Sequence, residues 1–435
     1  MGEHVTHAYD AVIVGARVAG AATAIHLARA GLRVLLLDQA AFPSDTLSSH
    51  QVQVPGVARL RRLGVLDQLR AAGTPATHRI RLDTGHTVLE GDLPPYDGIA
   101  EMYSPRRTVL DALLVATAET SGVEIREKFR VTELCWDGTR VVGVRGHRRS
   151  GGRPVDIPAR LVVGADGKRS IVATAVRARA YRERPALAVA CYAYWTNLPA
   201  PLGEMYQRPR RAIAVFPTND DLTMVYVAAP RAELAAFRRD PGAEVTRTLD
   251  GCGDLADRVR AATRVERFRI AAEQPNAMRM PYGPGWALVG DAGVVLDSIT
   301  AQGISNALRD AELLATAVIS ARYGVEPARD AYARFHRDRD ATVRPVFDFT
   351  TDLATFRPPG MASRILTTAL AGRPAQISRF LGMVTGSVRR SAYFSPGNLA
   401  SVFGPAGLLR IGAATVTSAL SPQRPSAWDG YGRRA

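Results

Sequence analysis

Three short motifs in this sequence combine glycine with a charged residue in the pattern that nucleotide sites use. The first is the stretch Gly15–Gly20 (GARVAG), which stands between an apolar run and an alanine-rich segment. Backbone N–H groups at the start of a helix bind a pyrophosphate, and the terminal glycines of such a stretch allow a tight turn and close packing of helix on strand. Arg17 replaces the usual middle glycine, so we expect it either to contact a pyrophosphate or to be an exposed loop arginine. Asp38 ends the next apolar run, where a carboxylate accepts hydrogen bonds from ribose hydroxyls.

The other two motifs each place an acid directly after an apolar run. Asp166 belongs to an Asp-Gly pair, which would lie beside a bound cofactor unless it is a simple surface turn. Asp291 follows Gly290, where it would accept from the ribityl hydroxyls of a flavin or simply cap a helix. Gln302 and Gly303 open the next helical segment, and backbone N–H groups there can face negative charge on a reduced flavin.

Apolar runs around these motifs predict the strands and helices that position them. Residues 9–15 and 33–38 have the length and composition of parallel strands buried on both faces, and 19–30 predicts the helix between them. The same strand-then-helix order returns at 286–290 and 303–320. The sequence therefore predicts an α/β fold in which a Rossmann-like dinucleotide-binding domain is interrupted by β-rich insertions and followed by a helical C-terminus.

Residues 56–72 predict one continuous helix, and Ser104-Pro105 predicts the start of another. The predicted organisation of the chain has four parts. The parts are a first domain at 1–175 with a β insertion near 78–100, a β-sheet substrate domain at 176–280, the completion of the first domain at 281–345, and a helical region at 346–435 whose tail, 421–435, is predicted to be disordered.

Composition narrows the classes of function. The 435 residues hold 56 Lys+Arg against 41 Asp+Glu, a net charge of +15, and all but Lys128 and Lys168 of these cations are arginines. The arginines are dispersed, often beside acids, so we expect no nucleic-acid binding but an attraction to anionic substrates or an acidic partner. Three cysteines without a CxxC pair predict neither a disulfide framework nor a metal site. We find neither a membrane-spanning run nor a signal-peptide pattern, and therefore expect a cytoplasmic protein.

Taken in their order along the chain, the three motifs resemble those of the FAD-binding aromatic hydroxylases, the flavoprotein monooxygenases of the para-hydroxybenzoate hydroxylase type. The resemblance covers about residues 9–345. It implies a Rossmann-like FAD-binding domain, FAD as cofactor, NAD(P)H as co-substrate and molecular oxygen as the oxidant. The residues that it assigns to the cofactor are Gly15, Ala16, Arg17, Ala19, Gly20, Asp38, Ser48, Arg107, Val131, Asp166, Gly290, Asp291, Gln302 and Gly303.

Several of these assignments carry a specific role. Arg107 resembles the family arginine that contacts FAD, with Arg106 as the alternative, and Val131 matches the backbone position beside the adenine. Residues 44–50 resemble the loop that passes the flavin. This loop holds His50, which is either a catalytic base or a donor to the flavin, or a structural histidine bonded to the backbone.

The chain departs from the family pattern after Gly290. Positions that the family fills with a histidine and prolines beside the flavin hold Val294, Asp297 and Ser298, and Ala301 replaces a glycine. These departures leave open a second possibility, an FAD-dependent reductase or dehydrogenase of the geranylgeranyl-reductase type. A flavin halogenase is less favoured, because that branch needs a lysine near the substrate and a WxWxIP stretch.

The substrate is expected on the inserted sheet, whose side chains alternate between its two faces. A substrate cavity on this sheet could be lined by Tyr206 and Met224 together with the residues named next. Alternatively, all of these side chains could form the core of the sheet. The residues predicted to contact substrate are Tyr192, Tyr194, Met205, Phe216 and Tyr226. We expect hydroxylation or epoxidation of an aromatic or polyketide-like small molecule in secondary metabolism, with the substrate either free or tethered to an acidic carrier protein.

Overall fold

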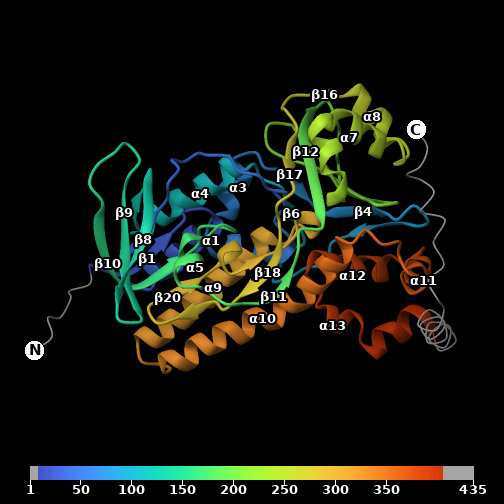
Figure 1. The fold of residues 1–435 in the computed structure, drawn as a ribbon. Coiled ribbons are helices and arrows are strands. Elements are labelled where there is room, and N and C mark those ends of the chain that lie inside the picture. Colours follow the sequence, from blue (N-terminus) through green and yellow to red (C-terminus); the bar gives the residue numbers. More distant parts are fainter. Residues whose placement is uncertain (1–7, 405–435) are drawn as a thin grey trace, which may run out of the picture. The chain divides into compact units, whose positions relative to one another are not determined.

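The computed structural model describes residues 8–404 (Figure 1). The chain forms two compact units, each assembled from three separated segments. The first contains residues up to 75, 103–187 and 273–351, and the second contains 76–102, 188–272 and the segment from 352. The predicted disordered tail at 421–435 lies outside the described residues.

A mostly parallel sheet forms the centre of the first unit. Its strand order is β19-β20-β10-β1-β2-β7, in which the edge strand β19 pairs in the antiparallel sense, and β9 (Arg140–Arg148) also pairs antiparallel with the first residues of β10. The central strands carry apolar side chains on both faces, as expected for a sheet that is covered on both sides. The strands are β1 (Tyr9–Val14), β2 (Val34–Leu37), β7 (Glu124–Arg126), β10 (Val155–Gly164), β19 (Tyr282–Gly283) and β20 (Trp286–Leu288).

One face of this sheet carries helices and the other carries a β-hairpin. Helix α1 (Val18–Arg29) contacts both α4 (Arg107–Thr120) and α9 (Gly303–Arg322) (Figure 1). On the opposite face, side chains of the sheet form a core with strand β8 (Phe129–Asp137) and helix α5 (Ile171–Ala175). The remaining elements of this unit are α2 (Val54–Arg62), α3 (Leu66–Ala71), β9 (Arg140–Arg148), β11 (Ala180–Arg184), β18 (Asn276–Arg279), β21 (Val294–Val295) and α10 (Ala328–Leu353), with β6 (Met102–Tyr103) at the boundary between the units.

The predicted α/β, Rossmann-like fold is confirmed, and two helices differ from prediction. The segment 56–72 forms two helices rather than one, because Gly64 adopts a φ of +75° and breaks the hydrogen-bond ladder between α2 and α3. Helix α4 begins at Arg107, after an extended Arg106, and not at Pro105. Within residues 8–404, none of the helices has the length and apolar character that a membrane crossing requires.

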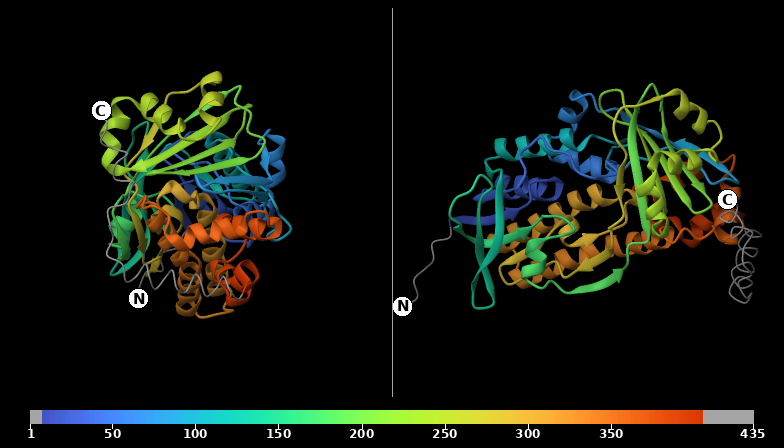
Figure 2. Two further views of the ribbon diagram at one scale, coloured as in Figure 1. Left: turned by 90° about the vertical axis from the view of Figure 1, so that its right-hand side faces the viewer. Right: turned by 45° about the horizontal axis from the view of Figure 1, so that its top comes forward.

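The second unit is an antiparallel sheet covered on one face by helices. Its strand order is β16-β12-β15-β14-β13-β4-β5, and β4 pairs with β13 in the parallel sense. The predicted β insertion near 78–100 therefore supplies two strands to this sheet. Helices α6 to α8, drawn yellow-green, lie along one face of the green strands (Figure 2) and share a core with them.

The bounds of the second unit's elements follow. The strands are β3 (Ala76–Thr77), β4 (Arg79–Asp83), β5 (Val88–Asp92), β12 (Ala188–Thr196), β13 (Gly203–Arg208), β14 (Arg211–Pro217), β15 (Thr223–Pro230), β16 (Thr263–Arg264) and β17 (Arg269–Ala271). The helices are α6 (Leu234–Arg239), α7 (Pro241–Leu249), α8 (Leu255–Ala261), α11 (Met361–Leu370), α12 (Pro374–Thr385) and α13 (Arg390–Tyr393).

Candidate functional site

The glycine stretch lies at the carboxyl end of β1, where the chain turns into α1. Gly15 has a φ of +102°, and a Cβ atom there would lie 2.5 Å from the carbonyl oxygen of Ala165. A Cβ at Gly20 would lie 1.7 Å from the carbonyl oxygen of Gly15. Both positions therefore require glycine, and the tight turn leaves backbone N–H groups at the first turn of a twelve-residue helix. This geometry fits a dinucleotide pyrophosphate.

Asp38 anchors this turn. Its Oδ2 accepts from the backbone N–H of Ala16 at 2.7 Å, and its Oδ1 accepts from that of Ala40 at 2.8 Å. The backbone carbonyl of Asp38 accepts from the N–H of Phe129, which begins β8. Val131, two residues further along β8, belongs to the core of the sheet. The predicted ribose and adenine positions therefore lie on adjoining elements.

A buried carboxylate joins the two arginines that were predicted to contact the cofactor. Asp111 Oδ2 accepts from Arg17 Nη1 at 2.6 Å, and Asp111 Oδ1 accepts from Arg107 Nη2 at 2.8 Å. Arg17 Nη2 also donates to Ser44 Oγ at 3.0 Å and to the carbonyl of Asp45 at 3.1 Å. Arg17 is thus neither free in solvent nor isolated, because it ties the start of α1 to α4 and to the 44–50 loop.

Asp111 was missed in the sequence, although one signal was present. It follows Arg107 by four residues on one helix, which is the spacing of an ion pair along a helix face. Its pairing with Arg17 joins segments far apart in the chain and leaves no such local pattern.

The Asp166-Gly167 motif adjoins the glycine stretch Gly15–Gly20. Asp166 Oδ2 accepts from the N–H of Ile171 at 2.7 Å, while its Oδ1 is buried without a hydrogen-bond partner among the described residues. Burial raises the pKa of Asp166, outweighing the hydrogen bonds that it receives. An unsatisfied buried oxygen at this turn fits a polar ligand such as a cofactor.

The third motif converges on the same place. A Cβ at Gly290 would lie 2.8 Å from that of Ala19 on α1 and 3.5 Å from that of Ala307 on α9, so all three backbones meet there. Burial raises the pKa of Asp291 to about 6, although the positive charges of Arg107 and Lys168 oppose the shift. The Gly-Asp, Asp-Gly and arginine motifs therefore surround one site in the first unit.

The turn before α9 contains a residue in the left-handed conformation. Ala301 adopts a φ of +50°, the left-handed conformation that the glycine usual at this position adopts without strain. Gln302 precedes the first residue of α9, Gly303, and its carbonyl accepts from the N–H of Asn306 at 2.9 Å. Within residues 8–404, no group of three or more His, Cys, Asp or Glu side chains is arranged to hold a metal ion.

His50 lies in the loop that Arg17 holds. It is fully buried, with a φ of +59°, and its backbone N–H donates to Ser48 Oγ at 3.0 Å. The loop then meets the rest of the unit through an isolated bridge between Val52 and Tyr103. The role of His50 as a catalytic base stays a prediction.

The predicted substrate residues share one face of the second unit's sheet. Cross-strand register places Tyr192 opposite Tyr226, and both Tyr194 and Phe216 opposite Met224. Met205 pairs with Ala214, the neighbour of Tyr226 on the same face.

Neighbouring side chains shape this face. The rings of Tyr192 and Tyr194 meet edge to face with centroids 5.9 Å apart. Gly203 has no side chain, and a Cβ atom there would lie 2.8 Å from the ring of Phe216. The ring therefore packs over the backbone of Gly203.

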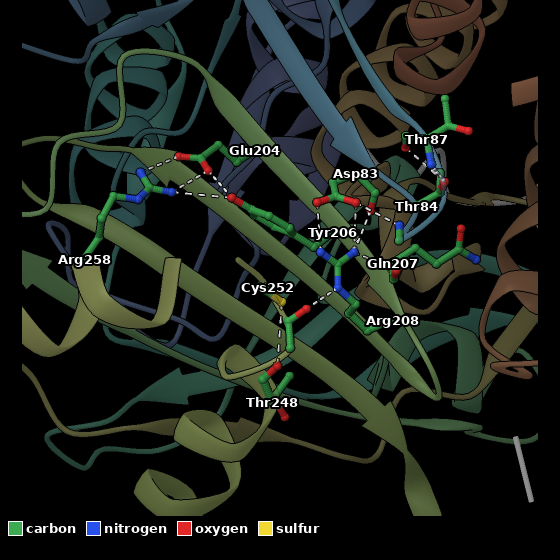
Figure 3. Close-up of polar contacts among 12 residues, drawn as sticks. Asp83, Thr84, Thr87, Glu204, Tyr206, Gln207, Arg208, Thr248, Cys252 and Arg258 are labelled. Carbon is green, nitrogen blue, oxygen red and sulfur yellow. Dashed lines mark hydrogen bonds and ion pairs between the residues drawn. The ribbon is translucent and has the colours of Figure 1, made fainter. Parts of the chain in front are cut away.

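Tyr206 has a different role from the cavity-lining one considered in the sequence. It lies on the opposite face, within the core beneath α6 to α8. Figure 3 shows its hydroxyl directed at Glu204, which accepts from Arg258 Nη1 at 2.9 Å and from Nη2 at 2.6 Å. Arg208 pairs with Asp83 of β4 at 2.8 Å, which fixes the parallel β4–β13 contact. These polar groups stabilise the sheet.

Comparisons with known proteins show the family of the chain. The family model described as FAD binding domain matches residues 8–350. Tryptophan 2-halogenase from Chondromyces crocatus is 25% identical over 342 residues, 75% of this chain and 64% of the halogenase, so the chain spans less than two thirds of that protein. Digeranylgeranylglycerophospholipid reductase 1 from Methanococcoides burtonii is 28% identical over 325 residues, 71% of this chain and 73% of the reductase. The monooxygenase 6-methylpretetramide 4-monooxygenase from Streptomyces rimosus is 26% identical over 332 residues, 69% of this chain and 73% of that enzyme.

Solved structures share the fold. A flavin-dependent brominase superposes with a TM-score of 0.75 at 19% identity, over 96% of this chain and 100% of the brominase. A flavoprotein/dehydrogenase from Cytophaga hutchinsonii gives a TM-score of 0.77 at 18% identity, over 93% of this chain and 100% of that one. Because the family model covers most of the chain and its motifs meet at one site, the chain belongs to the FAD binding domain family and is an FAD-dependent oxidoreductase of the flavoprotein monooxygenase superfamily.

Proposed function

We propose that this enzyme uses NAD(P)H and O2 to hydroxylate or epoxidise an aromatic or polyketide-like small molecule. The observation that carries the proposal is the sheet face of the second unit, where aromatic and thioether side chains gather in register. Such a face binds flat apolar molecules through area burial and ring contacts. The match to a monooxygenase named for 6-methylpretetramide supports a polyketide-like substrate, and a role in secondary metabolism.

The residues of the first unit would hold the cofactor. Bound FAD would supply the redox chemistry, accepting hydride from NAD(P)H and activating oxygen. The glycine stretch would bind the pyrophosphate, with Arg17 and Arg107 oriented by Asp111. Asp38 would accept from the adenosine ribose and Asp291 from the ribityl chain. Ser48, Val131, Asp166 and the backbone of Gln302 and Gly303 would complete the cofactor site.

Two other product classes compete with this proposal. The match to a reductase favours the addition of two hydrogens to a double bond, and the match to a halogenase favours transfer of a halogen. Against the halogenase, Lys168 Nζ donates to the Glu273 carbonyl at 2.6 Å and to Gln274 Oε1 at 3.2 Å, and Lys128 is exposed at the turn before β8. Both lysines of the chain thus belong to the first unit, whereas the sheet that is proposed to bind substrate belongs to the second.

An acidic carrier protein is proposed as a partner that presents the substrate. One relative, from Pseudoalteromonas luteoviolacea, is named as a brominase of a pyrrole carried on a peptidyl-carrier protein. The net charge of +15 would favour such an acidic partner. Equal turnover of free and carrier-bound substrate at low salt would contradict this part of the proposal.

The first experiment is the visible spectrum of the purified protein, recorded anaerobically before and after NADPH or NADH. Bleaching of an oxidised flavin spectrum would support direct reduction by a nicotinamide. Mass spectrometry of products from a panel of aromatic polyketides then separates the classes, since a monooxygenase adds one oxygen atom, a reductase two hydrogens and a halogenase a halogen. Product without added oxygen would refute the monooxygenase.

Adjacent residues on opposite faces of β14 test the substrate surface. Phe216→Leu should raise KM for substrate while leaving the flavin spectrum unchanged. Val215→Ala, on the core face, should lower stability and leave KM unchanged. Equal KM in both variants would place the substrate elsewhere.

A further inference from the structure

The turn that leads into α9 carries a buried acid that the proposed chemistry does not use. Asp297 lies between β21 and the 3-10 turn Ser298–Thr300 and is 3% exposed. Its backbone N–H donates to Asn276 Oδ1 at 2.7 Å, and the carbonyl of Leu296 accepts from Gln274 Nε2 at 2.9 Å. These bonds fix the turn, so the carboxyl is held inside the protein.

Asp297 is the one acid without an ion pair among the acids of residues 8–404 that are no more than 6% exposed. It accepts a hydrogen bond from the backbone N–H of Ile299 at 3.0 Å, and it forms no ion pair with any described residue. The five other acids in that range of exposure each pair with an arginine: Asp111, Glu204, Glu244, Asp310 and Asp340. Asp166 and Asp291 are more exposed, although burial raises their pKa as well. A buried carboxylate without a cation is costly, so a neutral acid or an additional partner is required at Asp297.

The groups that form hydrogen bonds with this turn are uncharged. Strand β18 supplies the amide of Asn276, and the following turn supplies the N–H of Ile299. On α10, the hydroxyl of Thr350 is hydrogen-bonded to that of Thr300 at 2.8 Å. The one charged side chain that these described hydrogen bonds link to the turn is Lys168, and it reaches the turn only through Gln274.

The same surroundings contain a second unused polar group. Asn276 Nδ2 is fully buried and has no hydrogen-bond partner among the described residues. A protonated Asp297 and this amide would together present two donors and no negative charge. That combination suits the carbonyl oxygens of a neutral planar heterocycle. Burial raises the pKa of Asp297 to about 6, so the neutral form is accessible near physiological pH.

We propose that Asp297 contacts the flavin ring of bound FAD as a neutral carboxylic acid, so that FAD binding takes up a proton at this residue. The motif residues Gly290–Asp291 and Gln302–Gly303 flank it in the chain, and both pairs belong to the proposed cofactor site. Asp297 is thus a cofactor-binding residue that replaces a family proline. The inference rests on FAD as the cofactor and is independent of which product the enzyme forms.

The test is the pH dependence of FAD affinity, measured by fluorescence on the full-length protein stripped of its flavin. The dissociation constant of the wild type should be constant below about pH 6 and should then rise by up to about tenfold per pH unit. Asp297→Asn should remove the loss of affinity above about pH 6 and bind FAD tightly at alkaline pH. The pKa of Asp291 in the same site is also about 6, and its titration should persist in this variant. Asp330→Asn, an exposed acid on α10, is the matched control and should follow the wild type.

Each outcome bears on the inference. The same pH dependence in Asp297→Asn and the wild type would overturn it and leave Asp297 as a cap for its own turn. If circular dichroism shows that Asp297→Asn does not fold, Asp297→Ser keeps the capping oxygen and removes the titrating group. Calorimetry of the wild type in buffers of different ionisation enthalpy gives an independent answer, since the absence of proton uptake would also overturn the inference. A wild type that binds no FAD at any pH would instead contradict the cofactor assignment.

Discussion

Replacing Asp111 by asparagine tests whether the arginine cluster is held by a single buried charge. The carboxylate is fully buried and accepts from Arg17 at 2.6 Å and from Arg107 at 2.8, 2.9 and 3.2 Å. Asparagine preserves the shape but turns an N–H2 group toward one guanidinium and removes the negative charge from both. Two like charges would then lie side by side without their counter-ion.

The expected cost follows from the exposure of the two arginines. Breaking a buried ion pair by removing one partner costs about 3–5 kcal/mol. The Arg107 side chain is 10% exposed and keeps its charge buried, whereas that of Arg17 is 28% exposed and can turn partly to water. We therefore expect a loss near the lower end, about 3 kcal/mol.

The assay is urea denaturation of the flavin-free protein followed by circular dichroism. The matched control is Asp67→Asn, which removes an acid of the same unit whose side chain is 93% exposed in its pair with Arg70. This control should not change stability measurably. If Asp111→Asn were as stable as Asp67→Asn, the cluster would not depend on the buried carboxylate and the argument for its positioning role would fail.

Three further predictions concern other parts of the molecule. Gly20→Ala should abolish FAD retention, because its methyl group would lie 1.7 Å from a backbone oxygen, whereas Gly397→Ala has open space and should retain FAD, measured as flavin per protein after purification. Arg258→Met should destabilise the second unit by about 3 kcal/mol, because it leaves Glu204 buried without its cation, and adding Glu204→Gln should recover part of this loss in the same denaturation assay. The pKa of Asp297 is about 6 in the folded protein against an ordinary value of 3.8, so its ionisation destabilises the folded state increasingly as the pH rises from about 4 to 6. Asp297→Asn should therefore stabilise the flavin-free protein by about 3 kcal/mol at pH 8 and not at all below pH 4. Equal effects at both pH values would contradict the pKa shift.

Local signals in the sequence sufficed for the elements that carry the nucleotide motifs. The apolar run that became β1 is covered on both faces, and the glycines at 15 and 20 are required by contacts within a few residues or at the adjoining turn. The features that escaped prediction depend on distant partners. Nothing near Arg17 in the chain indicates Asp111, and nothing near Asp297 indicates that it is buried without a cation.

The inserted sheet shows the same limit. Alternation placed Tyr192 and Tyr194 on one face of their strand, because successive side chains of a strand point to opposite faces. It could not relate one strand to another, and the cross-strand register is what adds Phe216 and Tyr226 to that face. Tyr206 follows Met205 on β13 and therefore belongs to the other face, although its aromatic character suggested a cavity. The parallel pairing of β4 with β13 could not be inferred, because no turn joins the two strands.

The interleaved segments of the first unit have a consequence for synthesis on the ribosome. Strand β1 pairs with β10, and β10 pairs with β20, so the sheet is closed only after residues 286–288 have been made. At about 5–20 residues per second, on the order of 15–60 s separate the synthesis of β1 from that of β20. The sheet of the second unit, whose central strands β12 to β15 follow one another closely, can assemble during that interval. A nascent chain released before residue 286 would expose the edge of β10, a site for wrong pairing with other chains. Premature termination in this gene should therefore yield aggregates and not a soluble nucleotide-binding fragment.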